Sequence, residues 1–238
     1  MVNYTTRAEA QITASEMAEY MAGSELKKNS VLVAARHRPT VRVRSYGKAR
    51  KFLAAELIGN SQDPARIHER ARRFRESTSD DDFERQEDRM NADMLERYAT
   101  VYPRIQIPGA SFVAPPQKNW VWDISGLKIS IAPHFVILDT NRAGEEISGA
   151  GVFEYSKGKP YNPETARWFS TLLCLYAENV PLRGEPAYRL SGCLDVQTGQ
   201  FHPAPERRTR LLQLMEAAAL AIAQRWSAIP RPRPAGSN

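Results

Sequence analysis

Residues 120–157 read WVWDISGLKISIAPHFVILDTNRAGEEISGAGVFEYSK, and the fold depends on this stretch. It contains four short apolar runs, separated by Ser125-Gly126, by Ala132-Pro133 and by the turn Asn141-Arg142-Ala143-Gly144. Short apolar runs bounded by glycine, proline and asparagine are typical of strands joined by turns. The stretch therefore predicts one small sheet, with strands at 120–124, 127–132, 135–140 and 149–155.

Helical patterns lie on both sides of this stretch. Thr13 and Glu16 match a capping box, in which a hydroxyl and a glutamate three residues later satisfy free amides at a helix start. Asp63-Pro64 and Asn162-Pro163 also have the residue types that begin helices. The spacing of apolar residues predicts helices over about 13–21, 24–37, 46–58, 65–76, 80–99, 163–178 and 206–227, a strand at 188–196 and no element over 1–12.

This order of elements predicts an α+β fold, in which an N-terminal helical region precedes a small mixed β-sheet of four to five strands packed with helices. Four prolines between residues 103 and 118 mark the boundary between the two parts. We expect a helical region over 1–103, a sheet core over 104–229 and a disordered, proline-rich basic tail over 230–238.

The composition is that of a soluble globular protein, with 42% hydrophobic and 25% charged residues in 238. No apolar run reaches 18 residues and the N-terminus has no apolar signal core, so we expect a cytoplasmic protein without membrane partners. Cys174 and Cys193 each lie within an apolar run, which indicates reduced core thiols.

Positive charge is concentrated in one segment of this basic chain, whose net charge is +6 and whose pI is about 9.4. Seven basic residues and no acid occur between residues 36 and 51: Arg36, Arg38, Arg42, Arg44, Lys48, Arg50 and Lys51. With Tyr46 among them, they could follow the phosphate backbone of DNA or RNA. The alternative is a solvated face that pairs with the acidic stretch 80–88, and the sequence leaves both open.

The order of strands, helix, strand and helix between Trp120 and Trp226 resembles the core of the PD-(D/E)XK nuclease superfamily, including its RecB-like branch. The chain is otherwise similar to uncharacterised bacterial proteins. The resemblance implies an aspartate near one strand end, often after proline, and Asp/Glu-x-Lys on the next strand. Such carboxylates hold one or two Mg²⁺ ions, which prefer oxygen ligands in octahedral geometry.

Two positions depart from this pattern. Pro133-His134 stands where the family has its aspartate, and Tyr155 stands two residues before Lys157 where the family has an acid. Because side chains alternate along a strand, Glu154 and Lys157 should point to opposite faces unless a bulge intervenes. The core is therefore expected to be a degenerate one.

The leading hypothesis is a non-catalytic nucleic-acid-associated or complex-assembly protein without a cofactor, in a bacterial defence or mobile-element system. It would act with DNA or RNA, or with a protein partner in a larger complex. The alternative is a divergent Mg²⁺-dependent DNA nuclease, with Glu154 and Lys157 as catalytic residues and a metal bound by His134, Asp123, Asp139 and Glu154. A purely structural partner-binding protein is a third hypothesis, and the sequence leaves open whether the protein is an enzyme.

Overall fold

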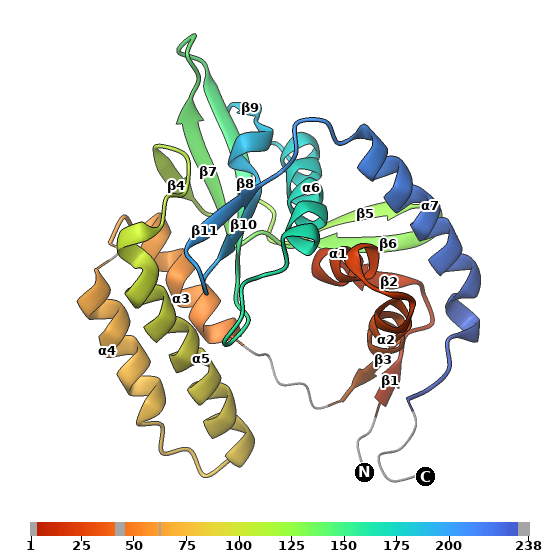
Figure 1. The fold of residues 1–238 in the computed structure, drawn as a ribbon, viewed down its shortest axis with the longest axis horizontal. Helices are drawn as coiled ribbons and strands as arrows, with labels where there is room; N and C mark the ends of the chain where they lie inside the picture. The colour runs from red at the N-terminus through yellow and green to blue at the C-terminus, as the bar shows by residue number, and fades with distance from the viewer. Residues whose placement is uncertain (1–3, 41–45, 62, 233–238) are drawn as a thin grey trace.

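A six-stranded mixed sheet forms the centre of the protein in the computed structural model, which describes residues 4–40, 46–61 and 63–232 (Figure 1). Its strands run in the order β11-β10-β8-β7-β4, with β9 beside β8. Strand β8 is antiparallel to β7 and parallel to β10. The strands are β4 (Ser111–Val113), β7 (Phe135–Thr140), β8 (Glu146–Glu154), β9 (Glu185–Pro186), β10 (Gly192–Asp195) and β11 (Gln200–Pro203).

The first two strands of the opening stretch belong to a different sheet. Strands β5 (Trp120–Ile124) and β6 (Leu127–Ile131) form a three-stranded sheet with β2 (Gln11–Thr13), which runs parallel to β6. The prediction of one sheet over 120–157 is therefore wrong. The chain leaves β6 at Ala132-Pro133, where proline offers no backbone N–H for a continuing ladder, and then enters β7.

The N-terminal segment is also not purely helical. Strand β1 (Tyr4–Thr6) pairs with β3 (His37–Pro39), and β2 extends the second sheet, so the prediction of no element over residues 1–12 is wrong. The predicted strand over 188–196 is instead a 3₁₀ turn at Tyr188–Leu190 followed by β10. The α+β class is confirmed, while the predicted sheet of four to five strands is replaced by three sheets.

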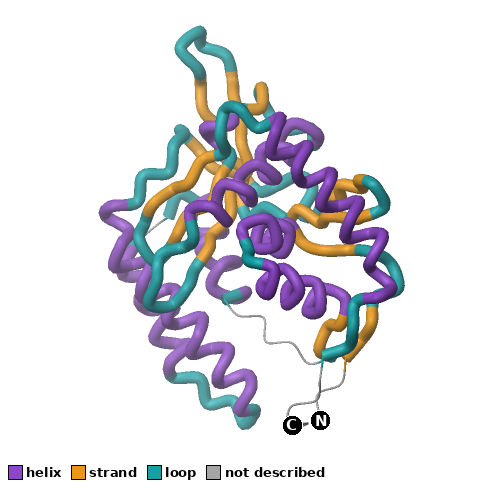
Figure 2. Tube along the Cα trace, turned by 45° about the vertical axis from the view of Figure 1, so that its right-hand side comes forward, coloured by secondary structure: helices purple, strands orange, loops and turns teal. Residues whose placement is uncertain are grey.

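Helices cover both faces of the central sheet (Figures 1 and 2). One apolar core joins that sheet to α1 (Ala14–Ala22), α2 (Glu25–Arg36), α6 (Pro163–Asn179) and α7 (Thr209–Arg225). The other joins it to α3 (Gly47–Ile58), α4 (Pro64–Arg75) and α5 (Asp82–Val101). The helices of residues 1–103 thus divide between the two faces, and none of the helices described is both long and apolar enough to cross a membrane.

The two faces of β8 determine where the candidate site lies. Ala150 and Val152 point into the core with α6, while Phe153 and Tyr155 point into the core with α5. Glu154 follows the alternation and lies on the same face as Val152. It is the last residue of β8, so its carboxylate lies at a strand end, where open α/β sheets commonly bind ligands.

Candidate functional site

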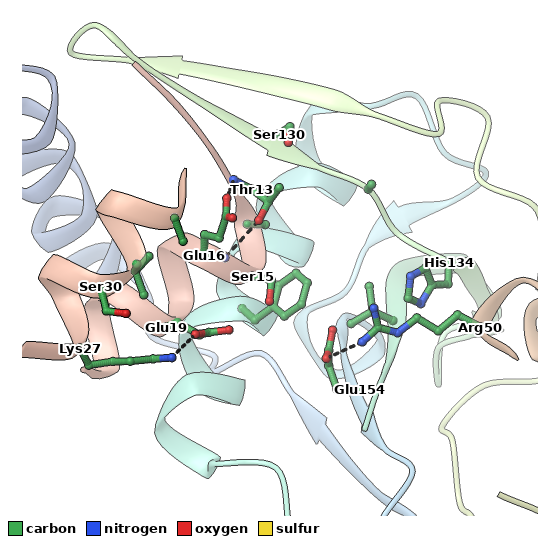
Figure 3. Close-up of a pocket in the computed structure, with 16 residues that line it drawn as sticks. Thr13, Ser15, Glu16, Glu19, Lys27, Ser30, Arg50, Ser130, His134 and Glu154 are labelled. Atoms are coloured by element: carbon green, nitrogen blue, oxygen red, sulfur yellow. Dashed lines mark hydrogen bonds and ion pairs between the residues drawn. The ribbon is translucent and has the colours of Figure 1, made fainter. Parts of the chain in front are cut away.

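A cavity of about 460 Å³ lies between α1, α2 and the end of β8 (Figure 3). Its ionisable lining side chains are Glu16, Glu19, Lys27, Arg50, His134 and Glu154. In Figure 3, Arg50 and His134 lie together beside Glu154, and the pair of Glu19 and Lys27 lies on the opposite side. The volume is within the range of small-molecule sites.

Arg50 reaches this cavity from the first turns of α3. Residue Tyr46, which precedes the helix, has a left-handed φ of 66°, and its ring packs edge-on against Tyr155 with centroids 5.0 Å apart. This contact fixes the start of α3 against β8. Arg50, one turn later, then donates from Nη2 to Oε2 of Glu154 at 2.9 Å.

The ion pair of Arg50 and Glu154 is largely removed from water, since 26% and 11% of the two side chains are exposed. Burial raises the pKa of Glu154, and the positive charge of Arg50 opposes that rise. Nε of Arg50 is buried without a hydrogen-bond partner, and the bond to Glu154 occupies Nη2. Nη1 makes no hydrogen bond within the described chain and remains as a donor.

His134 presents an N–H group to the cavity. Its Nδ1 lies 2.9 Å from the backbone nitrogen of Phe153, which can only donate, so Nδ1 is the acceptor and Nε2 carries the proton. Burial, with a smaller contribution from the charge of Arg50, lowers the pKa of His134 to about 3. The imidazole is therefore a neutral donor at physiological pH.

These contacts do not fit a Mg²⁺ site. A metal on Nε2 of His134 would require the proton on Nδ1, where it would face the N–H of Phe153. Glu154 already neutralises Arg50, and Mg²⁺ prefers oxygen ligands to nitrogen. Within residues 4–40, 46–61 and 63–232, no group of three or more His, Cys, Asp or Glu side chains is arranged to hold a metal ion.

The other two lining carboxylates also have partners. Glu19 lies 2.7 Å from Nζ of Lys27. Glu16 accepts from Arg38 at 2.7 Å and from the backbone N–H of Thr13 at 2.9 Å, as part of the predicted capping box. Each negative charge in the cavity wall is thus matched by a neighbouring positive charge.

The structure brings His134 and Glu154 together but places the other predicted metal and catalytic residues elsewhere. Asp123 is exposed on β5 in the second sheet. Asp139 lies on β7 and accepts from Arg189 at 3.1 Å. Lys157 donates to Asp93 of α5 at 2.6 Å, on the opposite side of β8 from Glu154. The predicted set does not converge on one point.

The basic residues predicted to bind nucleic acid are also dispersed. Arg36 donates to the backbone oxygens of Ser227 and Ile229, and Arg38 binds Glu16. Lys48 lies 2.7 Å from Asp88, as the alternative of pairing with the acidic stretch expects. Lys51 is exposed and forms no ion pair within the described chain, while Arg42 and Arg44 lie outside the described residues.

Sequence reasoning missed the partner of Glu154 and the role of α1 and α2. Arg50 and Glu154 are 104 residues apart, and no local pattern connects them. The hydroxyls that line the cavity come from the start of α1, the interior of α2 and strand β6: Thr13, Ser15, Ser30 and Ser130. Only the capping box at Thr13 carried a recognisable signal.

Comparison with known proteins matches this chain to no protein-family model and to no curated protein.

Proposed function

We propose that this protein associates with nucleic acid without cleaving it, on a core that resembles a degenerate PD-(D/E)XK nuclease. The observation that carries the proposal is the ion pair of Arg50 and Glu154. In the nuclease alternative Glu154 would bind a metal ion, whereas here its carboxylate pairs with the guanidinium group of Arg50.

The order of elements supports the resemblance on which the proposal rests. The central sheet contains three neighbouring antiparallel strands, β4, β7 and β8, and helix α6 and strand β10 follow β8 in the chain. The order β7, β8, α6 and β10 matches part of the order expected from the sequence, whereas β5 and β6 belong to the second sheet and β4 lies in the central sheet in their place. The bacterial cytoplasm and a defence or mobile-element complex remain predictions that rest on the resemblance alone.

The chemistry of the cavity supports binding better than hydrolysis. Arg50 and the neutral N–H of His134 can hold an anion, but neither takes a proton from water at neutral pH. Glu154 is the candidate base in the cavity wall, but its Oε2 already accepts a hydrogen bond from Arg50. No second carboxylate in the cavity wall is without a cationic partner.

The divergent nuclease remains the second candidate because Glu154 and His134 line the same cavity. One experiment separates the two functions. Labelled single-stranded and duplex DNA and RNA are incubated with the protein in Mg²⁺, Mn²⁺ or chelator, with binding followed by fluorescence anisotropy and cleavage by denaturing gels. We expect binding in chelator that weakens as salt rises, and no product.

Metal-dependent cleavage that disappears in Glu154→Ala would establish the nuclease instead, and Lys157→Ala would show whether Lys157 takes part in it. Failure to bind any nucleic acid at low salt would overturn the proposal in favour of a protein-assembly role. The double variant Arg42→Glu/Arg44→Glu tests the basic segment: if both residues contact phosphates, the slope of log affinity against log salt should fall by about 2.

A further inference from the structure

One side of the cavity presents two adjacent hydrogen-bond donors. Nη1 of Arg50 and the Nε2–H of His134 make no hydrogen bond within the described chain, and both side chains line the cavity next to each other (Figure 3). A guanidinium and a fixed imidazole N–H together match the oxygens of a phosphate or carboxylate. The pairing of each lining glutamate limits the repulsion that such an anion would meet.

The rest of the cavity is suited to a larger polar molecule than a free ion. Ser15, Ser30 and Ser130 line it with hydroxyls that make no hydrogen bond within the described chain. Val31, Val152 and Phe169 form an apolar part of its wall, and Phe169 supplies an aromatic ring. A cavity of about 460 Å³ has room for a sugar and a base beside a phosphate.

We propose that this cavity binds the phosphate monoester of a nucleotide, with the phosphate at Arg50 and His134 and the nucleoside toward Phe169. The same chemical group occurs on free nucleoside 5′-monophosphates and on the 5′-phosphorylated end of a strand. The inference deepens the proposed nucleic-acid association and rests on it where the ligand is a strand end. The serine hydroxyls of the wall and the carboxylate of Glu154 would then accept hydrogen bonds from the donors of the sugar and base.

Isothermal titration calorimetry with the full-length protein in chelator tests the proposal. The probes are 5′-AMP, 5′-CMP, adenosine, inorganic phosphate, and one oligonucleotide prepared with a 5′-phosphate or a 5′-hydroxyl. We expect 5′-AMP to bind at least about tenfold more tightly than adenosine, or the 5′-phosphorylated oligonucleotide to bind at least about tenfold more tightly than its 5′-hydroxyl form, or both.

Two variants locate the binding in the cavity. Ser15→Asp adds a negative charge to the lining at the second position of α1, where a helix start tolerates an acid. Ser24→Asp makes the same change at the exposed cap of α2, outside the cavity, and is the matched control. Binding should weaken about tenfold or more in Ser15→Asp and stay within about twofold in Ser24→Asp.

The double variant Arg50→Gln/Glu154→Gln removes the ion pair without leaving either charge unpaired, so it tests the site where Arg50→Ala could fail to fold. Retained affinity in this variant and in Ser15→Asp would overturn the proposal. The proposal would also be overturned if adenosine bound as tightly as 5′-AMP and the two oligonucleotides bound equally. A folded protein that binds no phosphate monoester would overturn it as well.

The outcomes also separate this inference from the proposed function. Salt-dependent binding of both oligonucleotides with no preference for the 5′-phosphate, and no binding of 5′-AMP, would overturn the cavity inference and leave nucleic-acid association standing. Binding of 5′-AMP that Ser15→Asp weakens, with no binding of any oligonucleotide, would support the cavity and overturn nucleic-acid association.

Discussion

Adjacent residues of β8 have different roles because their side chains point to opposite faces of the strand. On one face, Phe153 and Tyr155 are buried against α5 and the start of α3. On the other, Val152 and Glu154 border a polar cavity closed by α1, α2 and Arg50. One face is filled with aromatic rings and the other keeps space for a ligand. Residues one position apart should therefore respond very differently to substitution.

The aromatic face should give the largest effect. Phe153 is fully buried, with ring centroids 5.0 Å from Phe135 and 6.0 Å from Tyr98. Phe153→Ala should lower the free energy of unfolding by about 3–5 kcal/mol, because it removes apolar contacts and leaves a void. Urea denaturation followed by circular dichroism measures the change. A loss under about 1 kcal/mol would contradict the packing described for this face.

The cavity face should give the largest pH effect. The folded-state pKa of His134 is about 3, below the value near 6.5 of an unfolded chain, so protonation favours unfolding as pH falls from 6.5 toward 3. At pH 4.5 this residue should cost about 2.5 kcal/mol of stability relative to pH 7.

Urea titrations of the wild type and His134→Gln at both pH values measure this cost as a difference between the two proteins. The variant keeps an acceptor for the N–H of Phe153 but does not titrate. If the two proteins lost the same stability in acid, His134 would not be held neutral in the folded state.

Glu154 should show a smaller dependence of opposite sign. Burial raises its pKa in the folded state, so its contribution to stability is greatest below the pKa of the unfolded chain and declines as pH rises through the higher folded value. The stability of the wild type relative to Glu154→Gln should therefore fall between acid and neutral pH. A relative stability that rises over that interval would mean that Arg50 outweighs burial.

The smallest effect should come from Lys157, although it was predicted to share a site with Glu154. Its side chain is 70% exposed and its ion pair with Asp93 lies at the surface of α5. Lys157→Ala should change the free energy of unfolding by under about 1 kcal/mol. Ligand binding in the cavity should be unchanged. A clear loss of binding in the calorimeter would mean that a substitution on one face of β8 alters the cavity on the other face.

Much of the helical structure was predictable because helix starts are local. Thr13, Asp63 and Asn162 each satisfy backbone amides within three residues, and these bonds are present as expected. The division of the strands between sheets was not predictable. Strand β6 pairs with β2 from the chain start, and three residues of β2 carry too little pattern to signal a strand.

The candidate site was predicted only in its local geometry. Alternation along a strand correctly separated Glu154 from Lys157, because that rule needs only the sequence of β8. The partner of Glu154 comes from α3, and its contact depends on how that helix packs against Tyr155. A continuous run of basic residues gave no indication that Arg50 points inward while Lys51 points to solvent.

The central claim is that Arg50, and not a metal ion, neutralises Glu154. Electron paramagnetic resonance of free Mn²⁺, titrated with wild-type protein and with Glu154→Gln, tests it most directly. The account predicts that neither protein depletes the free Mn²⁺ signal below the level set by weak surface binding. A stoichiometric Mn²⁺ site in the wild type that is lost in Glu154→Gln would contradict it.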